Sequence, residues 1–517
     1  MSNVLMSRTL SLGVSGVNGY PVHVEVFGVG GIPGMEIIGL PDTSVRESRD
    51  RVSAAIINSG KQMQPRKITV NLAPADMKKE GPSFDLPIAV GVLTVMGEMI
   101  PSPSYPSDRT AVFGELSLDG KLRPVRGALP MVISAKECGI ENIILPRDNA
   151  KEVACIEGIS ILPAGSLGEV IQHIEGTALI EPQEQISYDE ICKENVIAVD
   201  MSQIRGQQAA RRALEVAAAG GHNMLMIGVP GSGKTMLARC LPGILPPMTF
   251  EESLETTRIH SICGRLTPDN GLMVTRPFSA PHHSSSVISL IGGGPNAKPG
   301  EVSAAHNGVL FLDELPEFSR GALEALRQPL EDGMVSVSRI RHQAQYQSSF
   351  MLIAAMNPCP CGYYGSTTHA CRCTPQEIRR YLDKISGPLL DRIDIQIEVD
   401  AVPVQEINNS VPAESSAKVA SRVAAARALQ QNRYIKEKFH CNAQLTNSAL
   451  RKFCSLNSEA ANLLNAAVES MQLSMRAYNR ILKTARTVAD LEGAENISSS
   501  HIAEAIQYRE LDQKYWR

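Results

Sequence analysis

The stretch GVPGSGKT at residues 228–235 constrains the fold of this chain more than any other feature. A short apolar run at 222–227 precedes it, and a helical pattern begins at 236–241. The order of strand, glycine-rich turn, Lys-Thr pair and helix forms a cradle whose backbone N–H groups surround a phosphate. We predict a nucleotide triphosphate site lined by Gly228, Val229, Pro230, Gly231, Ser232, Gly233, Lys234, Thr235 and Met236.

Catalytic roles in this site follow from the chemistry of phosphoryl transfer. We expect Lys234 to reach the β- and γ-phosphates of ATP, and the Thr235 hydroxyl to bind Mg²⁺. An apolar strand at 309–312 ends in two carboxylates, which suits Asp313 to the Mg²⁺ shell and Glu314 to orienting the attacking water. Asn357 ends another apolar strand and is suited to bridging the γ-phosphate and that water.

One arginine has two interpretations. Arg392 lies between Asp391 and Asp394, just before an apolar strand. It can be a local ion-pair partner of these carboxylates. It can also be an arginine finger that reaches the nucleotide of a neighbouring subunit, which would make a ring the active form.

Four cysteines form a CxC…CxC pattern in a single loop. Thiolates at this density can close a tetrahedral zinc site beside Asn357, with His369 as a substitute ligand. Zinc spacing is more often CxxC, so reduced cysteines without metal are the alternative. The four candidates are Cys359, Cys361, Cys371 and Cys373.

The bulk properties describe an ordinary globular protein. With 43% hydrophobic and 20% charged residues, the 517-residue chain has the size of about three domains. Its net charge of −4 gives no overall sign of nucleic-acid binding. No apolar run is long enough to span a membrane, and no export signal accompanies the eleven cysteines. We therefore expect a cytoplasmic, reduced protein without disulfides.

The pattern of elements predicts an α/β fold class with three parts. Short strands and amphipathic helices fill residues 1–175, and a linker without periodicity follows at 176–196. Strands alternate with helices at 197–402, which favours a parallel sheet covered on both faces. A second linker at 403–416 leads to a helical region at 417–517.

Three blocks of sequence resemble the ComM/YifB family. The first joins residues 217–223 to the phosphate cradle, the second covers 299–306 and 308–318, and the third covers 356–362. These proteins are AAA+ ATPases related to the magnesium chelatase ATPase subunit and more distantly to MCM helicases. The resemblance extends over essentially the whole chain. It implies an AAA+ P-loop core, an N-terminal α+β Lon-protease-like domain and a C-terminal helical lid.

The resemblance also implies roles for three residues. Asn357 matches sensor 1, and Arg392 matches the arginine finger that acts on the neighbouring subunit. The stretch Ser474-Met-Arg476 is similar to the sensor 2 motif of the lid, in which Arg476 folds onto the γ-phosphate. From the residues alone, Arg476 is one lid arginine among several.

The function implied by the resemblance is a hexameric, ring-shaped DNA motor. It would use ATP and Mg²⁺ for helicase action and branch migration in homologous recombination during natural transformation. Its partners would be single-stranded and branched DNA, a recombinase and other competence proteins. The alternatives are a magnesium chelatase-type subunit and an ATP-switched scaffold. The Lon-like domain and the cysteine cluster weigh against the chelatase.

Two segments resemble the pore loops of this group. Residues 334–342 look like the pre-sensor 1 hairpin, and Arg339, Arg341 and His342 would present positive charge to DNA phosphates. A solvated hairpin is the alternative. Residues 278–295 resemble the helix-2 insert, in which His282 and His283 are expected to be loop or nucleotide-proximal contacts.

The N-terminal region resembles the Lon protease domain but departs from it at one position. Residues 78–87 match the nucleophile loop and place Ser83 where the serine would be. The segment that carries the catalytic lysine in Lon offers Leu129 instead. A serine needs a base to become a nucleophile, so we expect no peptidase activity and a role as a collar or DNA-guiding platform.

Overall fold

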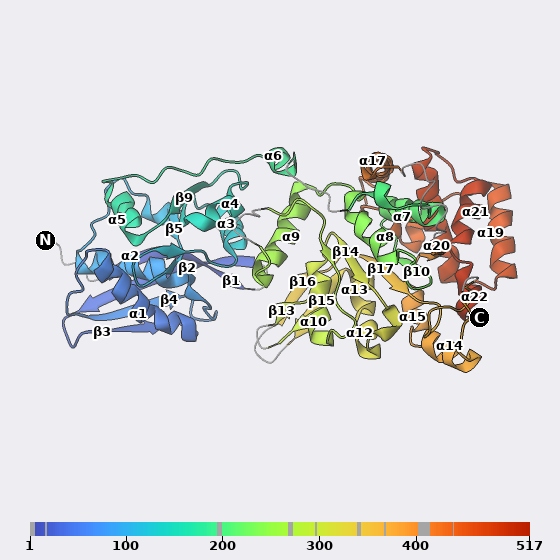
Figure 1. Cartoon of the computed structure of the whole chain (residues 1–517). Coiled ribbons are helices and arrows are strands. Elements are labelled where there is room, and N and C mark those ends of the chain that lie inside the picture. The colour runs from blue at the N-terminus through green and yellow to red at the C-terminus, as the bar shows by residue number, and fades with distance from the viewer. Residues whose placement is uncertain are drawn as a thin grey trace. The chain divides into compact units, whose positions relative to one another are not determined.

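The structure is a computed structural model, which describes residues 6–15, 18–193, 199–266, 272–294, 297–338, 343–366, 369–401, 414–437 and 439–516. Contacts divide the chain into two compact units. The first comprises Met1–Glu194 with Phe250–Val274, and the second comprises Asn195–Thr249 with Thr275–Arg517. Figure 1 shows the elements of each unit.

The first unit contains a seven-stranded mixed sheet with the order β3-β4-β2-β1-β5-β8-β9. The pairs β1–β2 and β2–β4 are antiparallel, and the other neighbours are parallel. The strands are β1 (Met6–Ser15), β2 (Asn18–Val29), β3 (Gly34–Ile38), β4 (Lys67–Ala73), β5 (Thr110–Val112), β8 (Asn142–Pro146) and β9 (Ser160–Ala164).

Helices cover both faces of this sheet because successive strand residues face opposite sides. Ile144 belongs to the buried cluster with α1 and α2, whereas Ile143 and Leu145 belong to the cluster with α3 and α4. The helices of the unit are α1 (Thr43–Asn58), α2 (Asp85–Met96), α3 (Ala128–Glu137), α4 (Ala150–Val153), α5 (Leu167–Glu175), α6 (Tyr188–Lys193) and α9 (Phe250–Cys263).

Two helices change the division that the sequence indicated. Helix α6 lies inside the predicted linker at 176–196, and α9 lies inside the predicted ATPase core yet belongs to the first unit. Phe250 of α9 packs on the cluster formed by α3. The Ser261 hydroxyl accepts a hydrogen bond from the Gly127 N–H at 3.1 Å and donates to Glu152 at 3.0 Å. Sequence periodicity could identify α9 as a helix, but not the unit against which it packs.

The second unit contains a five-stranded sheet with the order β11-β14-β17-β10-β18, and all its strands are parallel. Every residue of β10, β14 and β17 is buried, which explains their unbroken apolar sequences. The strands are β10 (Met224–Ile227), β11 (Phe278–Ser279), β14 (Val309–Leu312), β17 (Met351–Met356) and β18 (Ile395–Glu398). The predicted parallel sheet is confirmed.

Helices and two small hairpins surround this sheet (Figure 1). The hairpins are β12 (Gly292–Gly293) with β13 (Lys298–Pro299), and β15 (Met334–Ser338) with β16 (Gln343–Gln347). The helices are α7 (Gln208–Gly220), α8 (Lys234–Cys240), α10 (Val287–Ile291), α11 (Glu301–Ala304), α12 (Arg320–Ala325), α13 (Arg327–Asp332), α14 (Pro375–Leu382) and α15 (Gly387–Leu390).

The C-terminal part is helical, as predicted, and its described residues contain no strand. Its helices are α17 (Ser416–Arg433), α18 (Asn447–Phe453), α19 (Ser458–Ser470), α20 (Met475–Leu491), α21 (Ser499–Gln507) and α22 (Leu511–Trp516). Val419 of α17 and Val488 of α20 pack in the same buried cluster as β10 and β18. The helices therefore share a core with the five-stranded parallel sheet.

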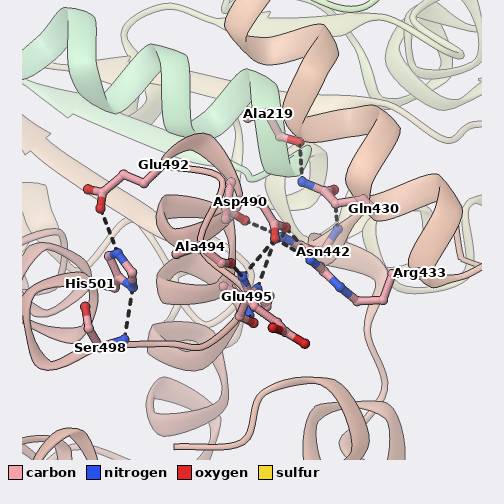
Figure 2. A network of polar contacts seen from close by, with 12 residues as sticks. Ala219, Gln430, Arg433, Asn442, Asp490, Glu492, Ala494, Glu495, Ser498 and His501 are labelled. Carbon is pink, nitrogen blue, oxygen red and sulfur yellow. Dashed lines mark hydrogen bonds and ion pairs between the residues drawn. The ribbon is translucent and has the colours of Figure 1, made fainter.

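A polar network holds the C-terminal helices together (Figure 2). Asp490 is 2% exposed and accepts hydrogen bonds from Arg433 at 2.5 Å, Asn442 at 2.8 Å and Arg486 at 3.1 Å. A buried carboxylate needs such donors, since burial removes its water shell. The network fixes α17 against α20.

In the part of the chain that the structure describes, no helix has the length and apolarity of a membrane span.

Candidate nucleotide-binding site

The glycine-rich loop joins β10 to α8, as the sequence predicted. Gly231 and Gly233 have φ angles of 78° and 91°, a left-handed conformation that glycine adopts without strain. Lys234 donates from Nζ to the carbonyls of Gly228 at 2.7 Å and Val229 at 3.0 Å, so its amine lies inside the loop. Burial lowers the pKa of Lys234, and the nearby charge of Asp313 partly offsets this.

The side chains of three neighbouring strands meet at the carboxyl edge of the sheet. Thr235 Oγ1 donates to Asp313 Oδ2 at 2.8 Å, which brings together the two groups predicted to hold Mg²⁺. Asn357 follows β17, and its Oδ1 accepts from Lys234 Nζ at 3.3 Å. Hydroxyl and carboxylate oxygens are the ligands that Mg²⁺ prefers, so these residues fit the ion.

Glu314 has an unusual conformation and an unexpected partner. Its φ is 52°, which is rare for a residue with a side chain, and its N–H donates to Asp313 Oδ1 at 2.9 Å. Its carboxylate pairs with His283 Nδ1 at 3.1 Å. His283 was expected only as a loop or nucleotide-proximal contact. An adjacent histidine pair after a short strand is the only signal that the sequence offered.

The two candidate arginines lie at the other edge of the sheet. β18 begins at Ile395, which pairs with Met224 at the start of β10, whereas the phosphate loop follows the end of β10. Arg392, which precedes β18, is 14% exposed on its side chain and pairs with Glu331. Arg476, which is 73% exposed, pairs with Asp391 at 2.9 Å. Neither arginine contacts the phosphate loop of its own chain among the described interactions.

The contacts of Arg392 bear on whether it is a local ion-pair partner of Asp391 or Asp394. Its side chain pairs with Glu331 and donates to the Pro388 carbonyl at 2.6 Å, rather than pairing with Asp391 or Asp394. Asp391 is instead the partner of Arg476. The contact of Arg476 with a γ-phosphate stays a prediction; in the structure its guanidinium pairs with Asp391.

A chain of buried hydrogen bonds connects this amino edge to the lid. His222 Nδ1 meets Asp394 at 3.1 Å, and His222 Nε2 meets the Thr487 hydroxyl of α20 at 2.8 Å. Asn442 donates to Thr487 at 2.9 Å and to Asp490, the centre of the network in Figure 2. Burial opposes ionisation of Asp394, but the hydrogen bond and charge of His222 hold its pKa at about 2.

The four candidate cysteines lie together. Their sulfur atoms are all within 4.8 Å of one another. His369, the alternative ligand, is outside this group, and its ring stacks on Tyr363 at 4.8 Å.

The segment predicted to bind DNA belongs to a two-stranded hairpin. The sequence pattern at 334–342 corresponds to the hairpin β15–β16, with pairing from Met334↔Gln347 to Ser338↔Gln343. Arg339, Arg341 and His342 lie outside the described residues. The described part of the segment similar to a helix-2 insert contains β11, α10 and β12, and β12 pairs with β13, which lies just beyond the segment.

The Lon-like region contains no serine–lysine pair at the predicted position. Ser83 lies in the turn before α2, and Leu129 is fully buried in α3. Lys79 lies four residues before Ser83, and its Nζ donates to the carbonyls of Pro74 and, at 2.8 Å, Met77. Arg51, which is partly buried, pairs with the buried Asp85 at 2.7 Å beside the same turn.

Comparison with known families covers most of the chain. Residues 200–407 match the model for magnesium chelatase subunit ChlI. Residues 24–149 match the model for subunit ChlI of Mg-chelatase, and residues 413–509 match the model for the ChlI C-terminal region.

Individual relatives support the same assignment. YifB of Escherichia coli is 43% identical over 502 residues, which are 96% of each chain. The competence protein ComM of Haemophilus influenzae is 43% identical over 505 residues, again 96% of each. Lon protease 2 of Bacillus subtilis is 28% identical over 176 residues, 32% of this chain and 30% of the protease. The chain therefore belongs to the YifB/ComM family, whose members combine a Lon-like region with a ChlI-type AAA+ core and a helical C-terminal region.

Proposed function

We propose that this protein hydrolyses ATP with Mg²⁺ and works in the cytoplasm as a ring-shaped, hexameric DNA motor. Helicase action and branch migration during natural transformation would be its task. The observation that supports the proposal is that the groups predicted to bind phosphate and Mg²⁺ lie at the carboxyl edge of the parallel sheet, whereas Arg392 lies at its amino edge. The competence protein ComM of Haemophilus influenzae, similar over nearly the full length, supports the biological setting.

The carboxyl edge supplies the groups that hold and orient ATP. Lys234 would release its loop carbonyls and donate to the β- and γ-phosphates. Thr235 and Asp313, already 2.8 Å apart, would hold Mg²⁺, which neutralises charge on the transferring phosphoryl group. Glu314 would accept a proton from the attacking water, and Asn357 would orient that water.

The amino edge supports completion of the site by a second subunit. Arg392 Nε is buried and has no hydrogen-bond acceptor among the described residues, so this guanidinium is incompletely satisfied. Arg476 is 73% exposed and pairs with Asp391, the residue that precedes Arg392 in the sequence. A neighbouring subunit that places its phosphate loop against this edge would meet both arginines. A closed ring of six copies gives every site such a neighbour.

DNA would bind in the centre of such a ring. The hairpin β15–β16 supports this role by its position in the sequence. It lies between β14, which ends next to Asp313, and β17, which ends next to Asn357. Arg339, Arg341 and His342 remain candidates for contacts with single-stranded and branched DNA. A recombinase and other competence proteins are the proposed partners, and the Lon-like region is the proposed collar or guiding platform.

The test is the ATPase rate of the assembled full-length chain with and without forked and four-way DNA. Stimulation by DNA, together with strand displacement or branch migration that Glu314→Gln abolishes, supports the motor. The variant Arg341→Ala should lose DNA stimulation, while Arg49→Ala, an exposed arginine on α1, serves as its matched control. DNA-independent turnover without strand movement would contradict the proposal.

A chelatase-type function is the second candidate because all three matching family models are named for magnesium chelatase. ATP-dependent insertion of Mg²⁺ into a porphyrin, assayed with the remaining chelatase subunits, would support it. An ATP-switched scaffold is the third candidate. It predicts nucleotide-dependent assembly, slow turnover and no response to DNA.

A further inference from the structure

The four cysteines between β17 and α14 form a compact group of sulfur atoms. The distances from Cys359 Sγ to Cys361 Sγ and Cys371 Sγ are 3.3 and 3.7 Å, and the distance from Cys361 Sγ to Cys371 Sγ is 3.6 Å. Cys373 completes the set within 4.8 Å. Disulfide sulfurs are about 2.05 Å apart, so these cysteines are not paired as disulfides.

The spacing matches a tetrahedral metal site. Zinc–thiolate bonds of about 2.3 Å place the four sulfurs of a tetrahedron about 3.8 Å apart. A tetrahedral set of four cysteine sulfurs is typical of structural zinc sites and of iron–sulfur centres, and the four sulfurs here lie close enough to one another to share a single ion. Backbone N–H groups also face the sulfurs, as shown by donation from Tyr364 to Cys359 at 3.3 Å and from Cys361 to Cys373 at 3.4 Å. Such donors stabilise thiolates that ligate a metal.

The same loop lies against the nucleotide site. Cys359 is two residues after Asn357, whose amide oxygen meets Lys234. Gly362, at φ 87°, approaches the phosphate loop so closely that a Cβ there would lie 2.7 Å from the ring of Pro230. If a metal holds Cys359 and Cys361 in place, it also limits the movement of Asn357, two residues away, and of Gly362 against Pro230.

The far end of the loop is anchored as well. Thr374, next to Cys373, caps α14 with its side chain and forms a capping box with Glu377. The Tyr364 ring meets the edge of Tyr515 in α22, with centroids 6.4 Å apart. The cysteine group is the point at which the phosphate loop, the Asn357 loop, α14 and the C-terminal helix converge.

We propose that Cys359, Cys361, Cys371 and Cys373 bind one zinc ion, and that this zinc holds Gly362 against Pro230 so that the phosphate loop is pre-organised for ATP. The metal assignment is independent of the motor function. Its effect on ATP rests on the proposed nucleotide site. The zinc ion takes no part in the chemistry at the phosphates.

The first experiment measures metal in the purified full-length protein by plasma mass spectrometry. One zinc per chain is expected, and the double variant Cys371→Ser/Cys373→Ser should contain almost none. Cys138→Ser, an exposed cysteine in the first unit, should keep its zinc. Iron in place of zinc, or no bound metal in the wild-type chain, overturns the proposal.

The second experiment measures binding of a fluorescent ATP analogue with Mg²⁺. Loss of zinc should weaken binding about tenfold, because an unfixed loop must be ordered on binding. Gly362→Ala should keep its zinc and weaken binding too, since the added Cβ displaces Pro230. If the cysteine variant does not fold, release of zinc from the wild-type protein by an organomercurial gives the same comparison. Unchanged affinity after zinc loss overturns the coupling.

These outcomes separate the zinc proposal from the motor proposal. A zinc-free protein that moves DNA contradicts only the metal site. A zinc-containing protein that binds ATP but ignores DNA contradicts only the motor.

Discussion

The two edges of the ATPase sheet are organised differently. At the carboxyl edge, Lys234 contacts Asn357 and Thr235 contacts Asp313 within one subunit. At the amino edge, Arg392 and Arg476 pair with Glu331 and Asp391, and Asp394 is tied through His222 to the lid. The fold of one chain thus brings together the groups predicted to bind phosphate and Mg²⁺, whereas the two arginines lie at the opposite edge of the sheet. We therefore expect ATP binding to need one subunit and ATP cleavage to need two.

The largest effect is expected in an experiment that mixes two inactive variants, which tests whether Arg392 acts on the nucleotide of a neighbouring subunit. Arg392→Ala should lower ATP hydrolysis by about 10³-fold or more while ATP still binds, because the charge-neutralising arginine is lost. Lys234→Ala should lose binding itself. Mixing the two inactive proteins should restore part of the activity, since some interfaces then combine an intact loop with an intact arginine. Absence of recovery in verified mixed rings would show that Arg392 acts within its own subunit.

Glu314→Gln tests the carboxyl edge with a smaller effect. Loss of the carboxylate that accepts the proton of the attacking water should lower hydrolysis by about 10²–10³-fold. Affinity for an ATP analogue should stay within about twofold, because the contacts of Glu314 among the described residues are with Asp313 and His283 and not with the glycine-rich loop. Asp313→Asn is the companion variant, and its defect should depend on Mg²⁺ concentration. An equal loss of binding in Glu314→Gln would contradict its catalytic assignment.

Asp394→Asn tests how much the hydrogen bond between Asp394 and His222 stabilises the fold. The low pKa of Asp394 means that its ionised form stabilises the fold above the unfolded-state pKa, near 4, and that this stability is lost as pH falls toward 2. The variant should be less stable by about 2–3 kcal/mol at neutral pH, and the difference should shrink between about pH 4 and pH 2.

Urea unfolding followed by the fluorescence of Trp516, the single tryptophan, measures this difference. Asp391→Asn is the control, because Asp391 is more exposed and its partner Arg476 lies at the surface. A pH-independent difference would exclude the ionised carboxylate as its source.

His283→Ala should have the smallest effect. Both His283 and Glu314 are partly exposed, at 35% and 52% of their side chains, so their pairing contributes about 0.2–1 kcal/mol. Freeing the carboxylate should raise the ATPase rate without DNA by less than about fivefold. His282→Ala, whose ring nitrogen contacts Ser284, is the matched control. A fall in the basal rate would show that His283 positions Glu314 for catalysis instead.

Local signals predicted the phosphate site because each of its residues belongs to a short motif next to a strand. The loop at 228–235, the pair Asp313–Glu314 and Asn357 all follow apolar runs, and parallel strands bring such ends to one edge. The grouping of the four cysteines was predictable for the same reason, since they lie close together in the sequence within one loop. The pairing of His283 with Glu314 was not predictable in this way, because it depends on a loop conformation without a sequence motif.

By itself, the sequence predicted the glycine-rich loop between a strand and a helix, the parallel sheet, the helical C-terminus and the cysteine cluster. Only the tertiary structure decided that α9 belongs to the first unit, that Arg392 and Arg476 lie opposite the phosphate loop, and that Gly362 touches Pro230. The physical reason is the range of the interactions. Turn geometry, apolar periodicity and ligand spacing act between near neighbours along the chain, whereas packing partners and edge positions are set by strand order and by contacts between distant residues.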